Sequence, residues 1–199
     1  MKVVIIRYNA GNIESVSNAL SRLGVDAEIT SDHQKIAQAD KVIFPGVGEA
    51  SSTMAYLRRE GLDRLIPSLT QPVLGICLGL QLMCSQSEEG NTSCLGIFSE
   101  QVKRFEAPPG SEHILKVPHM GWNALRNLKG NIFTGLHEQE YCYFVHSFYA
   151  SVGEHTSATC DYIHPFSAAL SRENFFATQF HPEKSGSPGA LILQNFLHL

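Results

Sequence analysis

Short, uninterrupted runs of apolar residues alternate with amphipathic segments through the first half of the chain. Residues 3–6 and 73–76 are continuous apolar runs of strand length, as is typical of strands buried on both faces of a sheet. Residues 25–29 alternate apolar and polar side chains, and residues 41–44 form a further short strand. Because these strands alternate with helical segments, the sequence predicts a parallel sheet with helices on both faces.

The segments between these strands carry the signals of helix ends. Asn12 stands where its side chain can cap a helix, and Gly24 stands where that helix should stop. We expect a second helix over residues 50–66 and a third that starts near Leu78. The first helix has one apolar face, made of Ile13, Val16, Leu20 and Leu23.

The pattern changes after about residue 89, where strand signals outnumber helical ones. Residues 106–113 have the composition of a loop, and Pro188 suits the first turn of a closing helix that runs to Leu199. We expect strands over residues 141–149, 156–162, 166–170 and 175–180. Together these signals predict one α/β domain over residues 1–199, with a mixed sheet that is parallel in its first half and a β-rich second half.

Composition argues against several classes of protein. The formal charge of −4 disfavours a nucleic-acid binder, which needs a clustered basic surface. The five cysteines are an odd number without a C-x-x-C pair, which disfavours a disulfide framework or a zinc site and favours the reducing cytoplasm. The apolar runs fall short of the roughly 18 residues of a membrane span, and the N-terminal run is too short for a signal peptide.

A glycine-flanked cysteine stands where an apolar strand meets an apolar helix. Residues 75–79 read Gly-Ile-Cys-Leu-Gly, which is the nucleophile-elbow pattern with Cys77 in place of serine. Such a turn projects the sulfur from the end of the strand beside a helix N-terminus, where a thiolate is stabilised. The backbone N–H of Leu78 is then free to donate to an oxyanion. The alternative is an inert thiol buried in a tight turn.

A nucleophilic cysteine needs a base that a third group holds in place. Residues 179–185 read Gln-Phe-His-Pro-Glu-Lys-Ser and follow an apolar strand. Pro182 favours an extended conformation for His181, so His181 and Glu183 can face the same side. The alternative is an ordinary polar surface loop. Because Cys77 and His181 both follow strands of parallel type, we expect them to meet at one edge of the sheet.

These motifs together resemble the class I (triad) glutamine amidotransferases. The Gly-Ile-Cys-Leu-Gly and Phe-His-Pro-Glu segments are similar to the two hallmark motifs of that family, and residues 45–48 resemble its oxyanion-strand loop. The resemblance covers nearly the whole chain. It implies a three-layer α/β fold with a mixed, mostly parallel central sheet flanked by helices.

Within that family, the chain most resembles the glutaminase subunits of imidazole glycerol phosphate synthases. Residues 8–12, 118–123, 143–147 and 180–185 carry this closer resemblance, and Pro-His-Met-Gly-Trp-Asn at 118–123 is the most discriminating segment. Two positions depart from the pattern. Phe148 stands where tyrosine is common, and Arg7 stands where an acidic or small residue is common.

The resemblance implies a thioester mechanism without a metal or an organic cofactor. Cys77 attacks the side-chain amide of L-glutamine, and the oxyanion accepts hydrogen bonds from the N–H groups of Leu78 and Val47. His181 passes a proton to the leaving nitrogen while Glu183 steadies the imidazolium. The resemblance further assigns the amino-acid end of glutamine to Gly48, Gln81, Glu89, Ser147 and Phe148. The alternatives are a solvent-facing Gln81 and a solvated loop carboxylate at Glu89.

The resemblance also implies a partner, since the motifs account for ammonia release alone. The expected partner is a TIM-barrel cyclase subunit, in a heterodimer that makes imidazole glycerol phosphate and an aminoimidazole carboxamide ribotide in histidine biosynthesis. Asn12, Trp122 and Lys184 are the expected contacts with that partner, and the alternative for Trp122 is core packing.

Three other functions remain open from the sequence. The first is a glutaminase that feeds another synthase, such as the pyridoxal-phosphate synthase type. The second is a cysteine hydrolase or peptidase of related fold, and the third is a binding module that retains the fold without catalysis.

Overall fold

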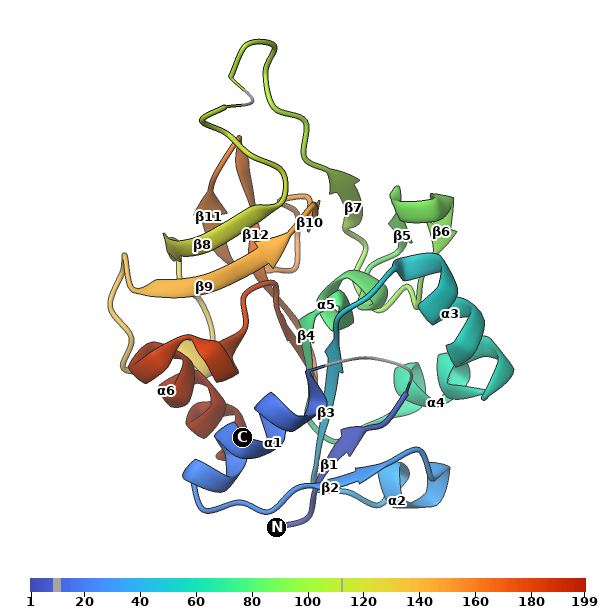
Figure 1. Cartoon of the computed structure of the whole chain (residues 1–199). Helices are drawn as coiled ribbons and strands as arrows, with labels where there is room; N and C mark the ends of the chain where they lie inside the picture. Colours follow the sequence, from blue (N-terminus) through green and yellow to red (C-terminus); the bar gives the residue numbers. More distant parts are fainter. Residues whose placement is uncertain (9–11, 112) are drawn as a thin grey trace.

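The computed structural model describes residues 1–8, 12–111 and 113–199. One mixed sheet runs through these residues, and its first part is parallel (Figure 1). In spatial order this part contains β2 (Glu28–Thr30), β1 (Val3–Ile6), β3 (Lys41–Gly46), β4 (Val73–Cys77) and β13 (Phe175–Thr178). The carboxyl ends of β3, β4 and β13 therefore meet at one edge, as the sequence predicts.

The second part of the sheet is largely antiparallel. It continues through β12 (Pro165–Arg172), β10 (Phe148–Ala150), β7 (Gln101–Arg104), β5 (Gln86–Ser87) and β6 (Thr92–Ser93), and β11 (Thr156–Asp161) pairs with β12. A separate antiparallel hairpin joins β8 (His119–Ala124) to β9 (Tyr141–His146). The second half is thus β-rich, as expected.

Helices cover both faces of the parallel part (Figure 1). α1 (Ile13–Arg22) and α6 (Gly186–Leu197) lie on one face. The other face carries α2 (His33–Ala37), α3 (Ala50–Arg59), α4 (Leu62–Ser68) and α5 (Leu78–Met83). Short 3-10 helices follow the strands at η1 (Glu89–Asn91), η2 (Asn131–Phe133) and η3 (Pro182–Lys184).

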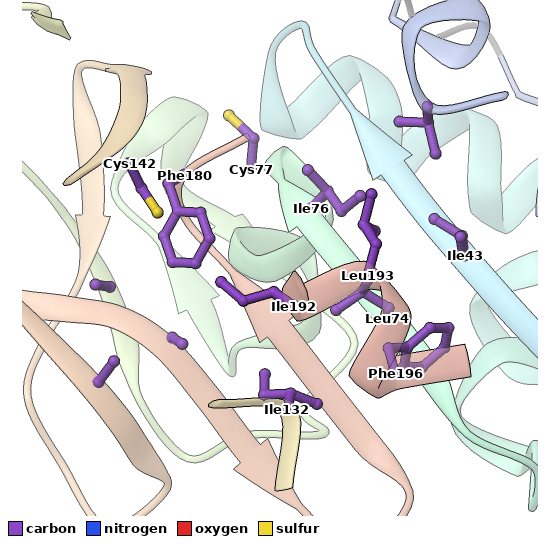
Figure 2. Close-up of a cluster of buried hydrophobic side chains, with 14 of the residues drawn as sticks. Ile43, Leu74, Ile76, Cys77, Ile132, Cys142, Phe180, Ile192, Leu193 and Phe196 are labelled. Atoms are coloured by element: carbon purple, nitrogen blue, oxygen red, sulfur yellow. The ribbon is translucent and has the colours of Figure 1, made fainter. Parts of the chain in front are cut away.

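The two hydrophobic cores follow from the alternation of side chains along buried strands. Val3 and Ile5 of β1 pack with α1 and α6, whereas Val4 and Ile6 pack with the helices of the opposite face. Figure 2 shows the first core, where Ile43, Leu74 and Ile76 face the α6 residues Ile192, Leu193 and Phe196. Cys77 lies at the upper end of this core with its sulfur directed away from these side chains (Figure 2).

Two predicted helix features differ from the structure. Asn12 has a left-handed backbone with φ of 73°, and its side chain makes no capping bond to α1. The expected helix over residues 50–66 is two helices, because Gly61 adopts φ of 71° between α3 and α4. The predicted stop of α1 at Gly24 is confirmed, since the N–H of Gly24 bonds to the Ser21 carbonyl.

The predicted strands also need correction. The expected strand over residues 141–149 breaks at Ser147, so that β9 pairs with β8 while β10 joins the main sheet. The strand expected at 25–29 is limited to Glu28–Thr30, and the one expected at 175–180 ends at Thr178. The closing helix begins at Gly186, before Pro188, and ends at Leu197. Within the described ranges, the helices are all too short or too polar to cross a membrane.

Candidate functional site

The turn between β4 and α5 holds Cys77 in a conformation that non-glycine residues rarely adopt. Its φ is 55° and its ψ is −108°. The flanking glycines are required by close packing. A Cβ at Gly75 would lie 2.5 Å from the Met83 sulfur, and one at Gly79 would overlap the carbonyl oxygen of Phe44. The G-x-C-x-G spacing therefore forms the sharp strand-to-helix turn that the sequence predicts, with Cys77 at its apex.

Cys77 opens into a cavity of about 350 Å³. The structure brings to its wall every residue that the sequence assigned to the oxyanion or to the glutamine: Val47, Gly48, Leu78, Gln81, Glu89, Ser147 and Phe148. Pro118, Val145 and His146 complete the lining. A thiol at the wall of a concave, largely apolar pocket is suited to attack a small bound substrate.

His181 and Glu183 form a buried pair next to Cys77. The His181 Nδ1–H donates to Glu183 Oε1 at 2.7 Å, and both side chains are almost fully buried. Burial alone would lower the pKa of His181, but interaction with the Cys77 side chain and with Glu183 outweighs it and raises the pKa to about 10. The second ring nitrogen, Nε2, has no conventional hydrogen-bond partner among the described residues and remains available for proton transfer.

Asn12 lies against this pair. Its amide Nδ2 donates to Glu183 Oε1, the oxygen that also accepts from His181. The side chain that the sequence assigned to helix capping and to partner contact thus holds the Glu183 carboxylate in the structure. Residues 9–11 of the same segment lie outside the described residues.

A chain of side-chain amides links Cys77 to the cavity wall. Gln179 Nε2 lies 3.7 Å from the Cys77 sulfur, and Gln179 Oε1 accepts from Gln81 Nε2 at 3.1 Å. Gln81 also donates to the Phe148 carbonyl at 2.8 Å. Gln81 is 4% exposed, so the alternative of a solvent-facing helix residue is wrong.

Two buried histidines lie on the other side of the Phe148 carbonyl, and His146 bonds to it directly. His146 Nδ1 donates to that carbonyl at 2.7 Å, which leaves His146 Nε2 to accept from His119 Nδ1 at 3.0 Å. Burial lowers the pKa of His119 to about 4 and that of His146 to about 3, so both rings are neutral at pH 7. With Gln81 on one side and His146 on the other, the backbone at 147–148 is fixed where it borders the cavity.

Glu89 is half-buried, and its carboxylate accepts a hydrogen bond from the Ala50 N–H at the start of α3, at 2.8 Å. Burial raises the pKa of this carboxyl group. Glu89 is therefore a half-buried carboxylate on η1 and not a fully solvated loop residue.

The remaining partner-contact residues are at the surface. Trp122 is 55% exposed on β8 and packs its ring edge-to-face with Tyr143, at 6.0 Å between centroids, so core packing does not explain it. Lys184 is exposed on η3, one residue after Glu183.

Comparison with known proteins matches residues 4–199 to the family model described as glutamine amidotransferase class-I. The chain belongs to the class-I glutamine amidotransferase family. The subunit HisH of imidazole glycerol phosphate synthase from Bacteroides fragilis strain YCH46 is 62% identical over the full length of both chains. The protein of the same name from Pasteurella multocida is 46% identical over 98% of this chain and 96% of its own.

Solved structures support the fold of this amidotransferase. A crystal structure of a glutamine amidotransferase superposes with a TM-score of 0.73 at 17% identity, covering 98% of this chain and 97% of that one. A glutamine amidotransferase from Thermotoga maritima gives a TM-score of 0.63 at 16% identity, covering 100% of this chain and 81% of that one. At such identities the likeness concerns the fold alone, and it confirms the three-layer architecture.

Several residues at the site of this amidotransferase stand in the sequence motifs, but the sequence did not indicate the contacts that they make. Gln179 stands directly before the Phe-His-Pro-Glu segment, and its place after the apolar run of residues 175–178 was the available signal. Tyr8 follows β1 and is also buried, and its phenol group contacts Pro45 near the carboxyl end of β3. The contact between Asn12 and Glu183 has no local sequence signal, because 171 positions separate the two residues.

Proposed function

We propose that this chain is the glutaminase subunit of an imidazole glycerol phosphate synthase, with Cys77, His181 and Glu183 as its catalytic triad. The observation that carries the triad is the meeting of a strained cysteine at the end of β4, which lines the cavity, with a buried His–Glu pair from the segment after β13. The 62% identity to HisH over the full chain length supports the synthase assignment. It favours this acceptor system over the pyridoxal-phosphate synthase type.

The chemistry follows from the charges of the triad. Because the pKa of His181 is about 10, its ring is an imidazolium at neutral pH and can stabilise a Cys77 thiolate. The thiolate attacks the glutamine amide carbon, and the N–H groups of Leu78 and Val47 take up the charge on the oxygen. His181 then gives its proton to the nitrogen, which leaves as ammonia while the thioester forms. Neutral His181 removes a proton from water, which hydrolyses the thioester to glutamate and restores the thiolate.

The cavity wall serves as the glutamine site in this proposal. Gly48, Gln81, Glu89 and the backbone at 147–148 surround the opening of Cys77 and offer both donors and acceptors to an amino-acid group. Glu89 is suited to the ammonium group, since a carboxylate in a half-buried position attracts a cation strongly.

Ammonia has to reach an acceptor before bulk water protonates it, so the proposal includes a docked partner. We infer a TIM-barrel cyclase subunit in a heterodimer, in contact with Trp122, Lys184 and the region of Asn12. The five free cysteines suit a cytoplasmic enzyme, and we propose that residues 1–199 act as a single amidotransferase domain.

Glutamate release tests the proposal. We expect turnover in the presence of the cyclase and its ribotide substrate, and a loss of about a thousandfold or more in Cys77→Ala, because removal of a nucleophile abolishes the covalent route. Cys94→Ala is the matched control, since Cys94 is a half-buried thiol away from the cavity, and it should retain turnover. Full activity of Cys77→Ala would overturn the proposed mechanism.

A further inference from the structure

Tyr8 is a buried tyrosine at the carboxyl end of β1, only 5% exposed. Its ring packs against Phe44 of β3, with 5.3 Å between ring centroids. Its hydroxyl donates a hydrogen bond to the carbonyl of Pro45. Tyr8 therefore connects the segment after β1 to the carboxyl end of β3, from which the chain continues to the cavity.

The carboxyl end of β3 is tightly enclosed where Tyr8 meets it. A Cβ at Gly46 would collide with the Tyr8 hydroxyl and would lie 2.9 Å from the Leu78 Cβ. Gly46 is thus confined between the phenol group on one side and Leu78, the residue after the nucleophile, on the other. In the register of the sheet, Gly46 stands directly beside Cys77.

The hydrogen bond from Tyr8 to the Pro45 carbonyl holds the peptide that comes one before the peptide carrying the Val47 N–H. The Pro45 carbonyl belongs to the peptide that links residues 45 and 46, and the next peptide carries the N–H of Val47. Val47 and Gly48 belong to the short loop after β3 and line the cavity, and Gly48 has φ of 137°, a backbone conformation that favours glycine. The loop is fixed again at Glu49, whose side chain accepts hydrogen bonds from the N–H groups of Ser51 and Ser52.

We propose that Tyr8 is a positioning residue that orients the Val47 N–H as an oxyanion donor, by holding the preceding peptide through the Pro45 carbonyl. The inference rests on the proposed function, which assigns that N–H to the oxyanion. Tyr8 touches neither substrate nor reacting atoms, so its effect is transmitted through the loop.

The phenol group is suited to this task because it stays protonated. Burial, together with the nearby Cys77, raises the pKa of Tyr8 well above its ordinary value. The hydroxyl remains a donor across the pH range in which the enzyme works. Phenylalanine at this position preserves the packing with Phe44 and removes only the donor.

The test compares Tyr8→Phe with the unaltered chain, each in complex with its partner subunit. We expect kcat for glutamate release to fall about tenfold with little change in KM, because the oxyanion forms after binding and one buried hydrogen bond is removed. Inactivation by a chloromethyl-ketone analogue of glutamine should slow by a similar factor, since a ketone develops an oxyanion on attack. Alkylation of Cys77 by iodoacetamide develops no oxyanion, and its rate, followed by mass spectrometry of the Cys77 peptide, should stay unchanged.

Tyr56→Phe is the matched control. Tyr56 lines the same surface cleft as Tyr8, but its ring lies under Arg59, so loss of its hydroxyl should alter none of the three rates. The inference is wrong if Tyr8→Phe leaves turnover and ketone inactivation intact. It is equally wrong if iodoacetamide alkylation falls in proportion, because Tyr8 would then act on the nucleophile or on folding. An active Cys77→Ala variant would instead overturn the proposed function itself.

Discussion

At the scale of single residues, the charge state of His181 controls the chemistry in the proposed mechanism. Its pKa of about 10 lies above the ordinary value of 6.5, so the stabilising interactions of the imidazolium are complete below pH 6.5 and are lost as the pH rises through about 10. We therefore expect kcat/KM for glutamine to fall on the alkaline side near pH 10. Glu183→Gln should move this limb to lower pH, because the carboxylate helps to hold the proton. The measurement is the pH profile of glutamate release in both proteins.

Glu100→Gln provides the control, since Glu100 forms a similar buried pair with His155 away from the cavity. Its alkaline limb should coincide with that of the unaltered chain. An unshifted limb in Glu183→Gln would show that the carboxylate does not set the protonation of His181.

Residues in local motifs were predictable, whereas those that act across the sheet were not. Cys77 and the His181–Glu183 pair each stand in a short segment whose glycines or proline reveal the backbone conformation. Tyr8 and Gln179 reach their partners only through the neighbouring strands, and a single sequence carries no signal of that register. Asn12 was assigned to helix capping because its position before α1 is a local signal, while its contact with Glu183 depends on the packing of α1 against η3.

At the scale of elements, α5 packs backbone to backbone against β3. Gly79→Ala places a Cβ on the Phe44 carbonyl, and a backbone atom cannot rotate away. We expect the variant to lower the free energy of unfolding by about 3 kcal/mol, the upper range for overpacking. Gly24→Ala isolates the cost of a left-handed backbone, because Gly24 has φ of 78° and open space around its Cα; about 1 kcal/mol is expected there.

Urea unfolding of both variants measures the two costs on one scale. A smaller loss in Gly79→Ala than in Gly24→Ala would mean that the turn can widen, and that the approach of α5 to β3 is not fixed by the glycine.

The elements of the first half were largely predictable from the sequence, because each buried strand is a continuous run of apolar residues. The strands of the second half were harder. β5, β6 and β7 are two to four residues long and carry mostly polar side chains. Their strand conformation therefore depends on pairing with distant strands and not on the local sequence. The sequence pattern does not predict β8 as a strand, although residues 118–123 stand out as a motif. The break at Ser147 arises because β9 pairs with β8 and not with a strand of the main sheet.

At the scale of the whole molecule, the β8–β9 hairpin connects the cavity to an exposed apolar surface. Val145 and His146 at one end of β9 line the cavity, while Met120 and Trp122 of β8 are 63% and 55% exposed. Exposed large apolar side chains next to a site mark an interaction surface. Because the proposed function requires ammonia to pass from this cavity to a second subunit, we expect the partner to cover the hairpin.

Trp122→Ala should therefore weaken association with the partner subunit by about 2 kcal/mol, or about 30-fold in Kd, as truncation of an aromatic anchor does. The free energy of unfolding of the isolated chain should change little, since the ring is more than half exposed. Titration calorimetry against the partner gives the affinity. Ile29→Ala, an exposed apolar change on β2, which is an edge strand of the main sheet, should leave the affinity unchanged. Equal affinities for the Trp122 and Ile29 variants would place the docking surface elsewhere, and ammonia would then have to leave the cavity by another wall.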